Sequence, residues 1–165
     1  MANDLTTRYC RWFDYERDVH AEVLASLETV PAERRTTPEF RRAVAIFAHI
    51  VAGRRIWLGR FGAAPPMTSP LFPENPDLER VKAAWQEAQE LWSKFLASAT
   101  DADLERPFEY QSLEGSRFRN RVEDILAQLF GHSSYHRGQI AMLVRAAGGE
   151  PAITDFVFWC REAIK

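Results

Sequence analysis

Cysteine is scarce in this sequence: only Cys10 and Cys160 occur among 165 residues, and their spacing matches no metal-binding or redox motif. No apolar run approaches the roughly 20 residues that span a membrane. The 21 basic and 23 acidic residues are interspersed and leave a formal net charge of −2, which excludes an electrostatic footprint for nucleic acid. The first residues do not form a signal peptide pattern. We therefore expect a cytoplasmic protein with reduced thiols and with no nucleic-acid or membrane partner.

The length and the spacing of apolar residues indicate one all-α domain spanning residues 1–165. Hydrophobic residues make up 46% of the chain and charged residues 27%, as in soluble globular proteins. Apolar residues recur at steps of three and four, which is typical of helices with one buried face. The helices predicted in this way cover about 4–29, 37–61, 75–99 and 120–147.

The connections between these helices predict how the chain returns. Residues 62–75 contain four prolines and are long enough to run back along the second helix, so the second and third helices are expected to be parallel. A short hairpin is predicted within 101–119, with its turn at Glu114-Gly115. After Gly148-Gly149, Thr154 is expected to cap a short C-terminal helix, residues 155–164, that docks on the bundle.

Two histidines interrupt the predicted inward stripe of the fourth helix. That stripe consists of Val122, Ile125, Leu129, His132, His136, Ile140, Leu143 and Ala147. Because His132 and His136 are four residues apart, both imidazoles project from one helix face. A buried polar group is costly without a partner, and a shared divalent metal is the simplest partner for two. Histidines satisfied individually within the core are the structural alternative.

Other polar residues near these positions allow two interpretations each. Gln128 and Gln139 either orient a metal ligand through hydrogen bonds or lie on a solvated flank. Glu16 lies at the centre of the first helix's stripe. In the structural interpretation it forms a salt bridge to an arginine or lies in a water-filled pocket. In the functional interpretation it is a carboxylate that faces the histidines. His20 has no companion at ligand spacing and is interpreted as structural. Gly53, four residues after His49, is expected to leave room beside that ring.

The second helix carries a face rich in arginine, which hydropathy assigns to solvent. Its members are Arg41, Arg42, Arg54, Arg55 and Arg60. Because arginine is rarely buried without a partner, we predict that this face is exposed.

Several motifs, taken in order, resemble the DinB/YfiT-like superfamily of bacterial metalloproteins with four-helix bundles. These are Tyr9-x-x-Trp12; His49 followed by Trp57-Leu58-x-Arg60-Phe61; His132-x-x-x-His136-Arg137-Gly138-Gln139-Ile140; Gly148-Gly149-x-Pro151; and Thr154-Asp155-Phe156. The resemblance covers nearly the whole chain, and the block around His136 is its most specific part.

The resemblance implies an up-down-down-up four-helix bundle with a long crossover between its second and third helices. It also implies a metal held by three histidines, which correspond here to His49, His132 and His136. Relatives often carry another histidine where this chain has Tyr135, and some carry one where it has Gln128. These differences affect the surroundings of the metal and leave the three ligands intact.

By resemblance, the expected function is metal-dependent transfer of a low-molecular-weight thiol to an electrophilic small molecule. Zinc or nickel is the expected metal, with iron or manganese as alternatives. Arg137 or an arginine of the second helix would meet an anionic substrate, and Glu16 or Tyr135 would transfer a proton. The alternatives are a non-catalytic metal-binding stress or interaction protein and a metal-dependent hydrolase. No Glu-x-x-His pair occurs, which disfavours a di-iron oxidase.

The abundance of aromatic residues predicts an assembly. Five tryptophans and 11 phenylalanines are many for 165 residues, so some are expected to lie outside the core. We therefore expect a homodimer formed through bundle helices with symmetric contacts.

Overall fold

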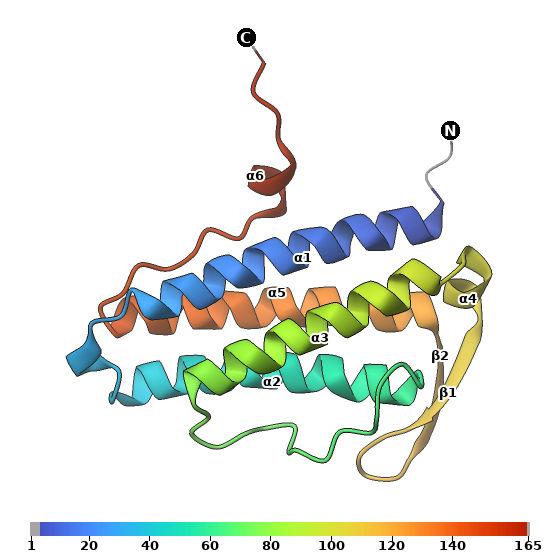
Figure 1. Ribbon diagram of the computed structural model, residues 1–165, viewed down its shortest axis with the longest axis horizontal. Helices are drawn as coiled ribbons and strands as arrows, with labels where there is room; N and C mark the ends of the chain where they lie inside the picture. Colours follow the sequence, from blue (N-terminus) through green and yellow to red (C-terminus); the bar gives the residue numbers. More distant parts are fainter. Residues whose placement is uncertain (1–3, 165) are drawn as a thin grey trace.

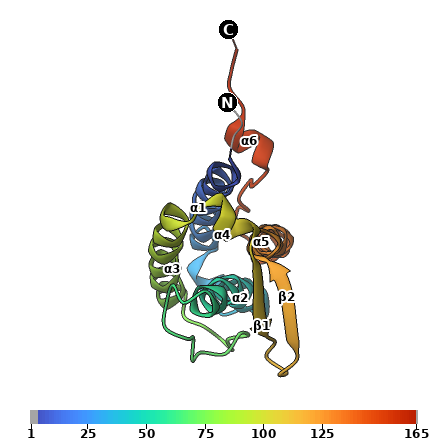
Figure 2. The same cartoon turned by 90° about the vertical axis from the view of Figure 1, so that its right-hand side faces the viewer.

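The computed structural model describes residues 4–164, and four long helices lie side by side within them (Figures 1 and 2). These are α1 (Leu5–Glu28), α2 (Pro38–Arg60), α3 (Leu78–Ser98) and α5 (Val122–Ala146). The shorter elements are the 3-10 helix η1 (Ala32–Arg34), the helices α4 (Asp101–Glu105) and α6 (Phe156–Cys160), and the strands β1 (Pro107–Gln111) and β2 (Arg117–Arg121). The predicted mostly helical fold is confirmed.

Side chains at the helix starts explain where three of the long helices begin. The carboxylates of Asp4 and Asp77 accept hydrogen bonds from backbone N–H groups in the first turns of α1 and α3. Thr37 does the same for α2, and Pro38 follows it at the first helical position. Each cap satisfies a donor that has no partner inside the helix. Thr37 is thus the N-cap that the sequence predicted.

The segment between α2 and α3 runs back along α2, so that these two helices point in the same direction (Figure 1). α1 and α5 run the opposite way. The returning segment passes below α2 rather than across the end of the molecule, as the end-on view shows (Figure 2). This path brings the middle of the segment next to the side of α2 that carries His49. There the backbone carbonyl of Leu71 is hydrogen-bonded to the His49 ring.

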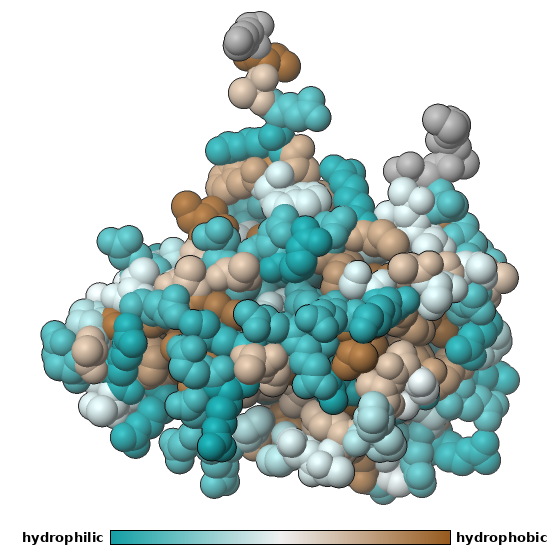
Figure 3. Space-filling view, in the orientation of Figure 1, coloured by the Kyte–Doolittle hydropathy of each residue, from teal (hydrophilic) through white to brown (hydrophobic). Residues whose placement is uncertain are grey.

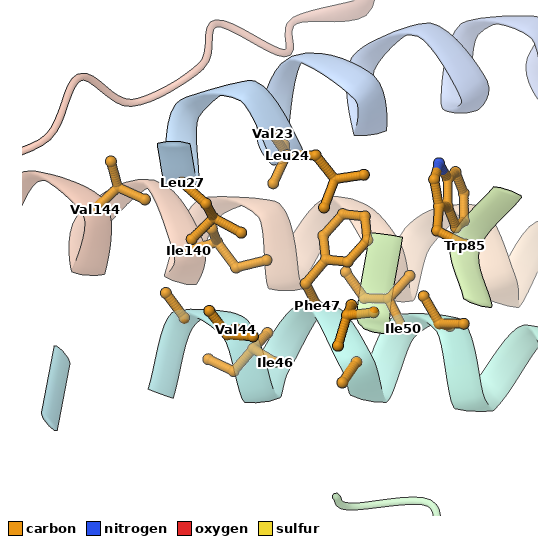
Figure 4. Close-up of a cluster of buried hydrophobic side chains, with 14 of the residues drawn as sticks. Val23, Leu24, Leu27, Val44, Ile46, Phe47, Ile50, Trp85, Ile140 and Val144 are labelled. Atoms are coloured by element: carbon orange, nitrogen blue, oxygen red, sulfur yellow. The ribbon is translucent and has the colours of Figure 1, made fainter. Parts of the chain in front are cut away.

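The core is apolar and lies between the four long helices. Figure 4 shows its larger half, where Phe47 and Ile50 of α2 meet Leu24 of α1 and Ile140 of α5. Trp85 and Trp92 of α3 are 4% and 1% exposed, so both rings belong to the core. The face drawn in Figure 3 is mostly hydrophilic, with small hydrophobic areas scattered over it. None of the helices within residues 4–164 is long and apolar enough to cross a membrane.

The predicted hairpin is present, and its strands delay the start of α5. β1 and β2 pair antiparallel, with Tyr110 opposite Phe118 and the turn at Glu114-Gly115 between the strands. Asn120 belongs to β2, so α5 begins at Val122, two residues later than predicted. The helix α4 was not predicted, because a single turn has too few residues to show a period.

The C-terminal helix is shorter than predicted. It ends at Cys160 instead of residue 164, and Asp155 precedes it as the cap residue in place of Thr154. Phe156 and Trp159 pack edge-on against Tyr15 of α1, with ring centroids 5.0 and 5.7 Å apart. The predicted docking of these two rings is therefore confirmed.

The end of α5 depends on two glycines. Gly148 has a φ of 85°, a left-handed conformation that favours glycine. A Cβ on Gly149 would lie 2.7 Å from the Val30 side chain, which is too close for any other residue. Together they let the chain turn back along α1 toward α6.

Candidate metal centre

Three histidine rings from two helices converge on one point. His49 comes from α2, and His132 and His136 come from successive turns of α5. The Nε2 atom of His132 lies 3.4 Å from that of His49 and 3.0 Å from that of His136. One ligand atom from each of the three rings lies within 4.8 Å of the other two. The predicted convergence is thus confirmed, and this group can hold a metal ion.

The outer nitrogens of two rings are fixed by acceptors, which determines the direction of their lone pairs. His49 Nδ1 lies 2.9 Å from the carbonyl oxygen of Leu71, and His136 Nδ1 lies 2.7 Å from Oε1 of Gln139. A carbonyl oxygen only accepts, so the proton of each neutral ring must be on Nδ1. The Nε2 lone pairs of His49 and His136 therefore point toward the shared centre, as in metal sites.

The spacing of these nitrogens suits a divalent ion. Without an ion, Nε2 of His132 can carry the ring proton and donate it to Nε2 of His136 or His49, whereas with an ion that proton would be on Nδ1 and all three lone pairs would face the centre. Ligand nitrogens about 2.0–2.1 Å from a tetrahedral zinc are about 3.3 Å apart, close to the two separations found here. Burial, followed by the neighbouring His136 and His49, lowers the pKa of His132 to about 4. Burial also lowers the pKa of His49, so both rings are neutral and ready to coordinate at pH 7.

A cavity of about 380 Å³ opens beside the histidines. His49 and His132 form part of its wall, together with residues of α2, α5 and the hairpin. Gly53 also lines it, and a Cβ added there would meet nothing within 4 Å. The predicted room near Gly53 is therefore present as open cavity. A metal bound by three histidines would keep a coordination position for water or a ligand, as catalytic sites do.

The inward face of α5 differs from the predicted stripe. His132 and His136 are half-buried, whereas Ser133 and Arg137 are 1% and 3% exposed and point into the bundle. The predicted stripe is correct at its other buried members, which are Val122, Ile125, Leu129, Ile140 and Ala147. It is wrong at the two histidines, because the residue after each of them takes the inward position. The histidines lie beside the buried face, which explains how they reach both α2 and the cavity.

The inward arginine forms part of a buried ion cluster. Glu16 of α1 is 0% exposed and accepts hydrogen bonds from Arg54 of α2 and Arg137 of α5. Burial opposes ionisation of Glu16, but His20 and the two guanidinium groups hold the pKa of its carboxyl below the usual value. Arg137 also donates to the hydroxyl of Tyr15 at 2.8 Å. The salt-bridge interpretation of Glu16 is therefore correct.

The expected solvated arginine face of α2 is wrong at two positions. Arg54 is 2% exposed, and Arg60 is half-buried in the cavity wall. Glu16 and Arg137 pair with each other and do not line the cavity beside the histidines. Their expected roles in proton transfer and substrate binding stay predictions.

The remaining predicted residues are distributed around the centre. Gln139 holds His136, as described above, whereas Gln128 lines the cavity near His132. Tyr135 is 65% exposed, and its ring centroid lies 5.2 Å from that of His136. Its predicted proton-transfer role stays a prediction.

Two residues of the crossover segment contact the centre and were missed by sequence reasoning. The carbonyl of Leu71 accepts from His49, and the ring of Phe72 stacks on the His49 imidazole at 4.4 Å with an interplanar angle of 8°. Backbone carbonyls leave no signal in a sequence. The stacking partner of Phe72 became evident only with the path of the chain.

We expect replacement of Gln139 by leucine to weaken metal binding about 10- to 100-fold, because His136 loses the acceptor that orients it. Zinc affinity can be measured by competition with a chromophoric chelator. Gln128→Leu, on the same helix and without a hydrogen bond to any of the three histidines, is the matched control and should change the affinity less than twofold. Equal effects of the two substitutions would contradict the orienting role.

His20 is buried next to Glu16 and gives the protein a sensitivity to acid. It is 0% exposed and lies against Phe47 and Trp85, which agrees with its predicted structural role. Burial, opposed by the charge of Glu16, lowers the pKa of His20 from 6.5 to about 3. As the pH is lowered, His20 of the unfolded chain binds a proton near pH 6.5, whereas His20 of the folded protein binds one only near pH 3. The free energy of unfolding therefore decreases as the pH is lowered from about 6.5 to about 3.

Between pH 7 and pH 5, the wild-type protein should lose about 2 kcal/mol more stability than the His20→Phe variant. Phenylalanine retains the edge-on packing and removes the titrating group. Urea unfolding at both pH values measures the difference. If the two proteins lost stability in parallel, the acid sensitivity would have to come from other groups.

The fold and the site together define a mostly helical protein with a three-histidine centre that can bind a metal. The sequence profile of the DinB family matches residues 1–163, and the chain belongs to this family. One curated relative, Protein DinB of Bacillus subtilis (strain 168), is 26% identical over 83 residues, which are 50% of this chain and 47% of that protein. The match thus spans about half the length of this relative. No solved structure matches the chain significantly.

Proposed function

We propose that this protein is a metal-dependent transferase that moves a low-molecular-weight thiol onto an electrophilic small molecule. The observation that supports this most is the group formed by His49, His132 and His136, whose nitrogens converge beside a cavity of about 380 Å³. A divalent ion held by three neutral imidazoles has a position left for a ligand, where it can stabilise a thiol as its thiolate.

The protein's own residues would hold and orient the reactants. Gln139 and the carbonyl of Leu71 keep the ring nitrogens pointed at the centre. The cavity wall, which is mainly apolar and aromatic, would exclude water from the electrophile. In the reaction, a bond forms between the thiol sulfur and the electrophilic carbon. That carbon loses either a leaving group, which departs with the electrons of the broken bond, or the π bond of a conjugated double bond, whose far carbon then takes up a proton. The thiol proton passes to a base, for which Tyr135 is our candidate if its hydroxyl relays it to solvent.

Elemental analysis and thiol-consumption assays test this function. The purified protein should contain about one zinc or nickel per chain and consume thiol with at least one member of a panel of electrophiles. Chelator treatment should remove both properties, and returning the metal should restore them. A metal-loaded protein that consumes no thiol but hydrolyses esters or amides would favour the hydrolase alternative. A protein that does neither would favour metal binding alone.

We also propose the finer features of the fold and setting. The four long helices are assigned to an up-down-down-up bundle, in line with the chain directions in Figure 1. The protein is assigned to the cytoplasm and to a homodimer. Large apolar side chains at the surface support an assembly, among them Met142, Ile153 and Val157, which are 70%, 72% and 59% exposed.

A further inference from the structure

The cavity beside the histidines has a second polar end. α2 contributes Trp57 and Arg60, and the hairpin contributes Tyr110 and Phe118. These residues close the side of the cavity that lies one to three helical turns along α2 from His49. The cavity therefore extends between a group of three histidines and an arginine, with aromatic rings along its wall.

Arg60 is held rigidly and has unused donors. Its Cζ lies 4.5 Å from the centroid of the Trp57 ring and 5.1 Å from that of Tyr110. Its Nη2 donates to the carbonyl oxygen of Gln111 at 2.9 Å. A guanidinium has five N–H donors, so this single bond leaves most of its hydrogen-bonding capacity available. These contacts already order the Arg60 side chain, so the entropy cost of ordering it when a ligand binds is reduced.

No carboxylate within residues 4–164 forms a salt bridge with Arg60. Glu114 lies in the same cavity wall, but it is exposed on the hairpin turn and does not pair with the guanidinium. The contrast with the other cavity-forming helix is clear, because Arg137 of α5 has a carboxylate partner in Glu16 and also donates to Tyr15. Arg60 is thus a half-buried, preorganised cation that faces a cavity and has no counter-ion among the described residues.

We propose that Arg60 is a carboxylate-binding subsite, so that the cavity takes a small molecule with a carboxylate at one end and its reactive end at the histidines. Arginine recognises carboxylates through two parallel hydrogen bonds, and the flanking rings suit a short planar or apolar connection. This inference rests on the proposed function for the nature of the reactive end. The carboxylate belongs either to the thiol or to the electrophile, and the two cases are separable.

Binding calorimetry on zinc-loaded protein tests the subsite. The thiol probes are 3-mercaptopropionate and 1-propanethiol, and the electrophile probes are crotonate and crotonamide. In each pair, the second compound lacks the carboxylate. The wild-type protein should bind at least one carboxylate probe about 10- to 100-fold more tightly than its neutral partner, and Arg60→Met should abolish that preference. Loss with the thiol pair alone or with the electrophile pair alone identifies which reactant carries the carboxylate.

Two further variants make the result decisive. Arg60→Lys keeps the charge and loses the paired geometry, so it should retain only part of the preference. Arg117→Met removes an 81% exposed arginine of the same hairpin that lies outside the cavity, and it should behave as wild type. If Arg60→Met and Arg60→Lys both kept the full preference with unchanged zinc content, the subsite would be refuted. If the protein bound carboxylates through Arg60 but transferred no thiol, the subsite would stand and only the transferase proposal would be refuted.

Discussion

Replacing Glu16 with glutamine is expected to lower the free energy of unfolding by about 3–5 kcal/mol, a large fraction of the stability of a domain of this size. In the folded protein the Glu16 carboxylate neutralises Arg54 and Arg137, and all three side chains are at most 3% exposed. Glutamine can accept from one guanidinium, but it leaves both positive charges without compensation. Chemical unfolding at pH 7 measures the loss.

Two controls separate this effect from the loss of any carboxylate on α1. Asp14→Asn removes a half-exposed partner of Arg17 and should cost less than about 0.5 kcal/mol. A triple variant, Glu16→Leu with Arg54→Met and Arg137→Met, removes all three charges and should recover most of the lost stability. If Glu16→Gln were as stable as wild type, the carboxylate would not be neutralising two buried cations.

The metal content of Glu16→Gln should stay unchanged at temperatures where the variant is folded. Glu16 is outside the group of residues whose ligand atoms converge, so the centre does not need its carboxylate. Loss of metal from a folded Glu16→Gln protein would mean that this carboxylate closes the coordination sphere. The site would then be structural, since structural metal sites have four protein ligands.

The sequence contained a signal for the buried arginines that hydropathy concealed. On α2 the apolar positions Ile50 and Leu58 lie on either side of Arg54 at steps of four, and all three are at most 2% exposed. The helical spacing of the apolar residues therefore placed Arg54 on the inward face. Its residue type favoured an exposed position, because arginine is rarely buried without a partner. That partner is Glu16, 38 residues earlier, and such a pairing requires the packing of helices that the sequence does not specify.

The stripe of α5 was wrong at its two histidines for a related reason. Steps of three and four starting at Val122 reach either His132 and His136 or Ser133 and Arg137, since adjacent stripes differ by one residue. Choosing between them needed knowledge of which polar pair has buried partners. The three histidines were nevertheless predicted as a group, because the resemblance to the DinB/YfiT-like superfamily implies them as ligands. That inference does not depend on which stripe of α5 faces inward. The Leu71 carbonyl and the particular arginine of α2 that lines the cavity could not be predicted, since both depend on the path of loops.

Replacing His136 with alanine is expected to abolish stoichiometric metal binding, with a loss of affinity greater than 100-fold. Two nitrogens, from His49 and His132, would remain, and a catalytic zinc site requires three protein ligands. Removing a half-buried side chain whose hydrogen bonds are to Gln139 and His132 should change the stability of the metal-free protein by about 1 kcal/mol. Elemental analysis after dialysis measures the metal, and thermal unfolding without metal checks the fold.

Tyr135→Phe provides the matched comparison, since this exposed residue precedes His136 on the same helix and offers no ligand nitrogen. It should keep its metal fully. If it also transfers thiol at the wild-type rate, Tyr135 is not the proton-transfer group, whereas a slower rate with unchanged metal content assigns that role to its hydroxyl. His136→Ala should lose metal and transfer together, because the thiolate is stabilised only where the metal is held. Full metal occupancy in His136→Ala would show that the ion is bound elsewhere, and the three-histidine centre would then have to be abandoned.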